Sequence, residues 1–364
     1  MKKSFLALAL MSAFSGAAFA QSSVTIYGIA DVGVSGFSAG AGKTARVESG
    51  QESGSRLGFK GTEDLGGGLK ANFVLEQGIL MDTGASDQGG LTFGRRSIVG
   101  LSGDFGAVNL GRDKSPTFQL FDNFDPFGSG FINNGNGLKG IYSISGGATA
   151  VGVNANTRGR VSNSVFYYTP SNIGGFYGVA QYGAGEVAGD NSAGRSIGFT
   201  GGYKADGLDV AYNYFKDNAQ DAKLVTNAKS ANTIAVNYNF GVATPVFIYQ
   251  KVKTDGTAAA QPIDRKIFTL GVTVPVDASG KLLATFTDVK DDTVLVAATG
   301  AKVGSAKQFA LGYQYALSKR TDLYTAYART NQDSTSTGFE AGGILKTAAG
   351  ANINEITAGV RHQF

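Results

Sequence analysis

A two-residue alternation that recurs along almost the whole chain constrains the fold more than any other feature. In residues 24–37, for example, Val24, Ile26 and Val34 fall on one face of an extended chain, while Tyr27 and Asp31 fall on the other. Period-two alternation is typical of β-strands. About sixteen such segments of roughly ten residues occur, beginning near 24, 53, 69, 91, 107, 163, 175, 195, 208, 232, 244, 265, 281, 306, 322 and 352.

The connections between these segments alternate between short and long. Short turns are expected at 64–68, 104–106, 171–175, 205–207 and 317–322, and long polar connections at 38–52, 82–90, 114–161, 217–231, 254–264, 290–305 and 331–351. Short turns at one end and long loops at the other are typical of membrane barrels, whose tilted strands need about 9–11 residues to cross the bilayer. We therefore predict an all-β fold, a transmembrane antiparallel up-and-down β-barrel of 16 strands.

A soluble β-sandwich is the alternative that the alternation leaves open. A sandwich of this length is expected to split into domains or to show many more turns, whereas a closed barrel satisfies every backbone group within lipid. The chain has no linker and no break in composition, so residues 21–364 are predicted to form a single barrel domain.

The two ends of the chain carry separate signals. Residues 1–20 begin with two lysines, continue with an apolar run and finish with small residues, which predicts a cleaved signal peptide. At the other end, residues 353–364 alternate again and stop at Phe364. We expect this last strand to pair with residues 24–37, because such pairing leaves the barrel without an edge, and we expect Phe364 to lie in the aromatic girdle.

Composition excludes several classes of function. The chain has no Cys, no Trp and one His, so disulfides, a His-based metal site or a catalytic triad have almost nothing to use. An outer-membrane enzyme would need a base near a nucleophile, and His362 falls on the lipid-facing side of its strand. The net charge of +4, about +2 without residues 1–20, does not favour nucleic-acid binding. No enzyme activity, cofactor or metal is expected.

Motifs spread along the chain resemble one known family. They are SSVTIYGIADVGV near the start, SRLGFKGTEDLGGGLKANFVLE, FGRRSIVGLSGDFGAVNLGRDKSP, DPFG, RVSNSVFYYTPSNIGGF, and TAGVRHQF at the end. Together they are similar to the trimeric general porins of Gram-negative outer membranes, of the kind found in Neisseria-, Bordetella- and Burkholderia-like bacteria.

The resemblance implies a homotrimer in the outer membrane, with residues 114–161 as a third loop folded into the lumen. It also implies that Phe364 is a signal for the barrel-assembly machinery, and that outer-membrane lipid and lipopolysaccharide surround the protein. A connection of roughly 48 residues is far longer than ordinary ones, which favours a functional loop. Its acids Asp122 and Asp125 are expected to face the passage, while its aromatic residues pack on the wall.

Arginines are the candidate residues of the opposite wall. Strand parity turns Arg56 inward, because Leu57 and Phe59 face lipid. The same parity turns Arg96 inward and Arg95 toward lipid, where an arginine costs about 2–4 kcal/mol. The family pattern nevertheless places a pore arginine at Arg95, so either it lies near the interface or a bulge turns it inward.

Arg160 matches a further family arginine, at the point where the long loop returns to the wall. Arg112 and Arg158 are weaker candidates. Guanidinium groups stay charged at every relevant pH, and a ring of positive side chains favours anions. We predict a general porin for passive diffusion of ions and small hydrophilic solutes with a mild anion preference. A solute-specific channel, which would need a continuous aromatic track in the lumen, and a surface adhesin are the alternatives.

Overall fold

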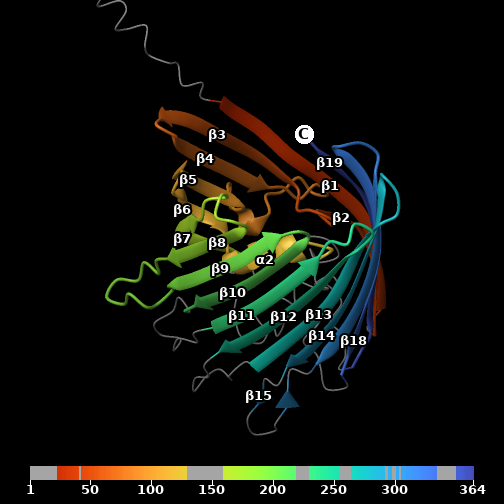
Figure 1. Ribbon diagram of the computed structural model, residues 1–364. Helices are drawn as coiled ribbons and strands as arrows, with labels where there is room; N and C mark the ends of the chain where they lie inside the picture. Colours follow the sequence, from red (N-terminus) through yellow and green to blue (C-terminus); the bar gives the residue numbers. More distant parts are fainter. Residues whose placement is uncertain are drawn as a thin grey trace, which may run out of the picture.

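The computed structural model describes residues 23–40, 42–128, 159–218, 229–254, 264–291, 294–296, 301–302, 305–333 and 350–364. These residues form a closed antiparallel barrel of 16 strands, which confirms the predicted fold class (Figure 1). The expected signal peptide, residues 1–20, lies outside the described residues.

The strands follow one another around the barrel in chain order. Their bounds are β1 Ser23–Ala39, β2 Gly42–Ser49, β3 Arg56–Gly66, β4 Leu69–Gly78, β5 Arg96–Gly103, β6 Gly106–Lys114, β7 Arg160–Tyr168, β8 Phe176–Gly183, β9 Ser196–Ala205, β10 Leu208–Asp217, β11 Lys229–Tyr238, β12 Thr244–Thr254, β13 Asp264–Pro275, β14 Gly280–Asp291, β17 Ala306–Ala316, β18 Thr321–Gln332 and β19 Ile353–Gln363. β15 Val294–Val296 and β16 Ala301–Lys302 form a separate small hairpin.

The last strand closes the barrel on the first, as predicted. β19 pairs antiparallel with β1 from Ile29↔Gln363 to Ser38↔Asn354. Backbone hydrogen bonds join Gly28 and Phe364 in both directions, at 3.0 and 3.1 Å. The Phe364 ring covers Gly28, where an added Cβ would lie 2.3 Å from the ring. A side chain at position 28 would therefore push the terminal ring away from the seam.

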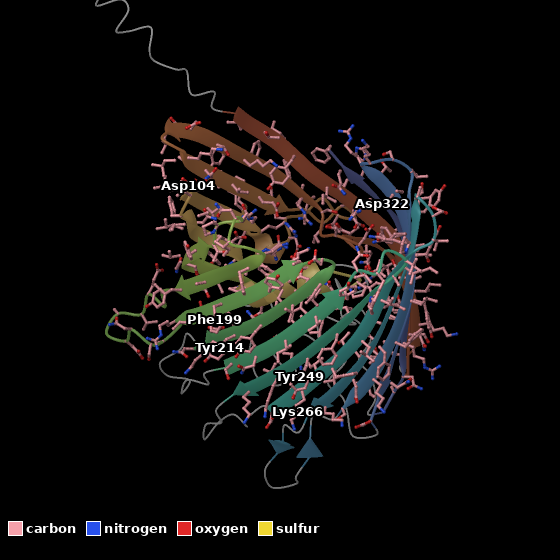
Figure 2. All side chains as sticks on the ribbon, in the orientation of Figure 1. Asp104, Phe199, Tyr214, Tyr249, Lys266 and Asp322 are labelled. Atoms are coloured by element: carbon pink, nitrogen blue, oxygen red, sulfur yellow. The ribbon has the colours of Figure 1, made fainter. Side chains whose placement is uncertain are left out.

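The outer face is covered mainly by large apolar side chains, whereas the inner face carries most of the polar ones together with apolar clusters such as the one against α2. On β1, Val24 and Ile26 are 65% and 62% exposed, whereas Asp31 and Ser35 are fully buried. Figure 2 shows Phe199, Tyr214 and Tyr249 along the outer wall, and Phe199 and Tyr214 are in ring contact at 5.9 Å. This inverted pattern follows from a lipid-facing exterior and a wet interior.

One predicted connection is wrong. Residues 38–52 were expected to form a long polar connection, but residues 42–49 form β2, which pairs with β1 from Val32↔Ser49 to Ala39↔Gly42. β3 pairs with the other half of β1, from Ser23↔Thr62 to Ile29↔Arg56. β2 and β3 are thus two halves of one barrel strand, separated by residues 50–55. The sequence pattern did not reveal β2, because the alternation of apolar and polar residues does not continue across residues 50–55.

Helix α2, Pro116–Phe124, begins the long connection between β6 and β7. Ser115 caps it by accepting a hydrogen bond from the Phe118 N–H at 3.2 Å, and Pro116 occupies its first turn. Leu120, Phe121 and Phe124 pack against the inward-facing residues Ala211, Ala235, Val246 and Ile248. The aromatic residues therefore hold this part of the connection against the inner wall, over β8–β12, and packing on the wall is what the sequence predicted for them.

The rest of that connection, residues 129–158, lies outside the described residues, as does Arg158. The other described helix is the short η1, Gln88–Gly90. Neither described helix is long and apolar enough to cross a membrane. The predicted short turns are confirmed: residues 67–68, 104–105 and 206–207 link their strands at the barrel end where β1 starts and β19 finishes.

Candidate functional site

Arg95 and Arg96 both turn inward. Arg96 is the register partner of Glu76 on β4, while the Arg95 N–H donates to the Glu76 carbonyl oxygen at 3.1 Å. Two residues thus oppose one, which is the arrangement of a β-bulge. The parity that placed Arg95 toward lipid is wrong because β5 begins only at Arg96; the alternative of an inward-turning bulge describes the structure.

The Arg95 side chain forms a buried ion pair. Its Nε lies 2.7 Å from Glu76 Oε1, and both side chains are only 6% exposed. The Tyr27 hydroxyl donates to the other Glu76 oxygen at 2.9 Å. Glu76 was not among the predicted residues, although Phe73 and Leu75 on the outer face of ANFVLEQG place it inward.

Arg56 lies beside this pair, and its hydrogen bonds to other described residues all go to neutral atoms. Its Nε donates to the Gly54 carbonyl oxygen at 2.8 Å, and its Nη2 donates to Ser53 Oγ at 2.6 Å. Gly54 also touches Arg95, because a Cβ at position 54 would lie 2.6 Å from Arg95 Nη1. Residues 50–55 therefore hold Arg56 next to Arg95.

Arg160 joins from β7. Its Nε donates to the Arg95 carbonyl oxygen at 2.9 Å, and its guanidinium lies over the Phe118 ring of α2 at 5.5 Å. We call Arg56, Arg95 and Arg160, with Glu76, the arginine cluster. Strands far apart in sequence bring its members together, so the predicted arginines do converge.

The two predicted acids of the long connection differ in position. Asp122 on α2 is half-buried, forms an ion pair with Lys114 and lies within electrostatic reach of Arg56. Asp125 is 6% exposed, and its Oδ1 accepts the Phe127 N–H at 2.9 Å. Asp125 is the C-terminal cap of α2, and its carboxylate is bonded to the backbone just beyond the helix.

Arg96 and Arg112 are engaged next to the cluster. Arg96 Nη2 lies 2.8 Å from Asp113 Oδ2. Arg112 Nε donates to the Gly94 carbonyl oxygen and its Nη1 to Ser162 Oγ, both at 2.8 Å. Arg112 thus braces the backbone just before Arg95. Asp113, like Lys114, was not predicted from the sequence.

A second set of charges lies on β1, β18, β19 and residues 50–55. Arg361 reaches Asp322 Oδ2 at 2.8 Å and Glu52 Oε1 at 2.9 Å. The Tyr324 hydroxyl donates to Asp31 Oδ1 at 2.6 Å. We call Asp31, Glu52 and Asp322, with Arg361, the acidic cluster. Sequence reasoning missed it, because strand parity places single residues inward without saying which of them meet.

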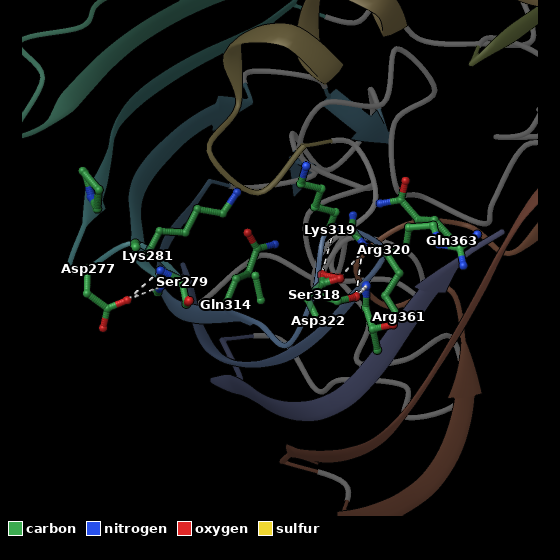
Figure 3. Close-up of a pocket in the computed structure, with 15 residues that line it drawn as sticks. Asp277, Ser279, Lys281, Gln314, Ser318, Lys319, Arg320, Asp322, Arg361 and Gln363 are labelled. Carbon is green, nitrogen blue, oxygen red and sulfur yellow. Dashed lines mark hydrogen bonds and ion pairs between the residues drawn. The ribbon is translucent and has the colours of Figure 1, made fainter.

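A cavity of about 390 Å³ lies next to the acidic cluster, at the barrel end with the short turns (Figure 3). Lys281, Lys319 and Arg320 line it together with Arg361 and Asp322. In the turn before β14, hydrogen bonds from the backbone N–H groups of Ser279 and Gly280 hold the pKa of Asp277 below its usual value. Cations therefore outnumber acids in the lining of this cavity.

Nothing in the described part of the chain is arranged as a metal site, since no group of three or more His, Cys, Asp or Glu side chains is placed to hold an ion. His362 is exposed, and its Nδ1 lies 2.8 Å from Thr321 Oγ1.

Known proteins share this architecture. The Gram-negative porin family matches residues 7–335. Outer membrane porin protein 32 of Delftia acidovorans is 37% identical over 374 residues, covering 100% of both chains. The structure of an anion-selective porin from Comamonas acidovorans has a TM-score of 0.79 and 33% identity, and covers 94% of this chain and 100% of that one.

A trimer form of OmpT from Vibrio cholerae has the same fold, with a TM-score of 0.68 over 94% of this chain and 99% of that one, at 18% identity. The family consists of channels and not of enzymes. The closed barrel, its apolar exterior and these full-length similarities lead to one conclusion. The chain belongs to the Gram-negative porin family and is an integral outer-membrane protein.

Proposed function

We propose that this porin is a general channel for passive diffusion of ions and small hydrophilic solutes, with a mild anion preference set by the arginine cluster. Arg96 and Asp122 complete the proposed constriction. The anion-selective Comamonas relative supports this proposal.

The observation that carries the anion preference is an imbalance of partners. Arg95, Arg96 and Lys114 each pair with a carboxylate. Within the described ranges, Arg56 and Arg160 donate only to neutral oxygen atoms. Two guanidinium groups without a paired acid leave a positive potential in a narrow wet passage, and low-dielectric walls focus that potential on a passing ion.

The test is a planar-bilayer recording of refolded protein under a KCl gradient. We expect three equal conductance steps and a reversal potential on the chloride side. In the double variant Arg56→Ala/Arg160→Ala, the chloride-to-potassium permeability ratio should fall about threefold, because the positive potential is lost. Lys307→Ala/Arg329→Ala is the matched control, since it removes the same charge from exposed positions on the outer face.

Three results would contradict parts of the proposal. A wild-type reversal potential on the potassium side would remove the anion preference but keep the channel. An unchanged ratio in Arg56→Ala/Arg160→Ala would remove the arginine role. A folded, inserted protein without conductance would remove the channel itself. A solute-specific channel gains no support from the described rings, because only one ring contact, Phe166–Tyr168, lies on the inner wall.

We also propose three partners. A homotrimer is supported by the trimer form of the Vibrio relative, and the three conductance steps test it. The barrel-assembly machinery would read Phe364, which is 50% exposed at the seam; deleting it should reduce the assembled fraction in membranes. The third partner, the phosphate groups of outer-membrane lipid and lipopolysaccharide, is supported by a row of lysines.

That row consists of direct register partners, Lys251↔Lys266↔Lys290, on β12, β13 and β14. Their neighbours Val252 and Val289 are buried on the inner face, so the lysines face outward, and Figure 2 shows Lys266 at the barrel end opposite Asp322. Like charges directly opposite each other are destabilising unless an anion lies between them. Replacing all three by Ser should reduce co-purified lipid phosphate, whereas replacing them by Arg should not.

A further inference from the structure

Residues 50–55, which interrupt the second barrel strand, are clamped by one buried acid. Asp31 is fully buried, and its Oδ2 accepts the backbone N–H groups of Glu52 at 3.0 Å and Ser53 at 2.6 Å. The main chain of Asp31 binds the same segment at both ends, through the Gly50 N–H at 2.8 Å and Ser55 Oγ at 2.9 to 3.0 Å. A carboxylate that accepts two backbone N–H groups is a strong, directional anchor.

The segment is also tied to strands on the far side of the seam. Glu52 Oε1 accepts the Gln314 amide of β17 at 2.6 Å and Arg361 of β19 at 2.9 Å. Tyr324 of β18 donates to Asp31. The segment therefore lies on the inner face of β1 and β17–β19. Helix α2 lies on β8–β11, on the other side of a barrel in which β1 and β10 are half a circuit apart.

Ser53 and Gly54 of this segment make the contacts that position the arginines. Ser53 Oγ and the Gly54 carbonyl hold both the Nη2 and the Nε of Arg56. Gly54 borders Arg95 Nη1, and Glu76 holds the Nε of the same guanidinium group at 2.7 Å. Any movement of residues 52–54 would therefore move Arg56 directly and open space beside Arg95.

We propose that residues 50–55 form the second wall of the constriction, facing α2, and that Asp31 is its positioning residue. Asp31 acts on selectivity through Arg56 and Arg95, although its own charge is negative. This inference rests on the proposed anion preference of the arginine cluster.

Two variants at one position separate positioning from charge. Asp31→Asn removes the charge but keeps an oxygen that can accept the Glu52 and Ser53 N–H groups. Asp31→Ala removes both. If only the charge of Asp31 mattered, both variants would raise the chloride-to-potassium permeability ratio equally, because an acid near the lumen attracts cations. Positioning predicts that the two variants differ, with a lower ratio in Asp31→Ala than in Asp31→Asn.

We expect Asp31→Asn to hold or raise the ratio in bilayer recordings, and Asp31→Ala to lower it about twofold with a larger single-channel conductance. Asp209→Asn, which removes another buried acid on β10 away from the segment, is the control for charge alone. In an Arg56→Ala/Arg95→Ala background, Asp31→Ala should no longer lower the ratio, because the residues through which it acts are absent.

A ratio in folded Asp31→Ala trimers equal to or above that of Asp31→Asn would overturn the proposal. If Asp31→Ala does not fold, Ser53→Ala decides, because it leaves Asp31 intact and removes one contact to Arg56; an unchanged ratio there would also overturn it. Failure of the proposed function is distinct, since it appears in the wild-type protein and in Arg56→Ala/Arg160→Ala without any change at Asp31.

Discussion

The arginine cluster and the acidic cluster lie on two sides of residues 50–55 and are near mirror images in charge. One has three arginines and a single acid, and the other has three acids and a single arginine. The two clusters also differ in the number of hydrogen bonds that their charged groups make. The acids accept backbone N–H groups, a tyrosine hydroxyl and a side-chain amide, so protein donors offset much of their negative charge.

Within the described part of the chain, the arginines are held at a few atoms each and keep other donors available. Arg56 and Arg160 use neutral acceptors, and the one acid, Glu76, is occupied by Arg95 and Tyr27. The comparison teaches that a charged group serves permeation where its partners are too few to neutralise it, and serves structure where its partners are many. Three pairs of substitutions can break or sharpen this difference.

The largest effect is expected from the acids that occupy matching places in the two clusters. Glu76→Gln should lower the free energy of unfolding by about 3–5 kcal/mol, because it leaves the buried Arg95 without its carboxylate. Glu52→Gln should change it by less than about 1 kcal/mol, since Arg361 keeps Asp322 and repulsion among three acids falls. Urea unfolding followed by circular dichroism measures both. Equal losses would show that the two clusters are equivalent in stability.

The next effect concerns the anchor of the segment. Tyr324→Phe removes the hydroxyl that donates to Asp31 Oδ1 at 2.6 Å, and a hydrogen bond to a charged group contributes about 1.5–3 kcal/mol. Tyr327→Phe is the control, because its hydroxyl binds Asn354 on an exposed face. We expect a lower urea midpoint only for Tyr324→Phe. If both variants unfold at the same urea concentration, Asp31 does not depend on Tyr324.

The smallest effect on stability, about 1 kcal/mol, is expected from Gly54→Ala, because its Cβ would lie 2.6 Å from the end of the Arg95 side chain. The displaced guanidinium should lower the chloride-to-potassium permeability ratio in bilayer recordings. Gly201→Ala is the matched control, since nothing lies within 4 Å of the added Cβ. A ratio that stays the same in Gly54→Ala would show that Arg95 can move without affecting permeation.

Much of the barrel architecture could be predicted from the amino-acid sequence. The alternation of apolar and polar residues placed strands such as β11 and β13, and glycine-rich turns such as 64–68 placed the short connections. The alternating terminus predicted the pairing of β19 with β1. These features were predictable because a strand's period of two depends on nearest neighbours, and because lipid reverses the usual burial so that apolar side chains lie outside.

Less of the site could be read in this way. Parity indicated Arg56 and Arg96 correctly, and the family resemblance indicated Arg95 and Arg160. Parity alone placed Arg95 toward lipid, because a bulge adds one residue that periodicity does not register. β2 was missed for a similar reason, since residues 50–55 leave the wall and return.

The sequence by itself thus determined which way most side chains point and that the chain closes into a barrel. Only the tertiary structure decided which of the inward residues meet, as when Asp31 of β1, Glu52 and Tyr324 of β18 come together. Orientation is local, because it follows from the geometry of two successive residues. Which inward-facing residues contact one another depends on the register of every strand and on closure of the barrel. Register and closure bring residues hundreds of positions apart within hydrogen-bonding distance.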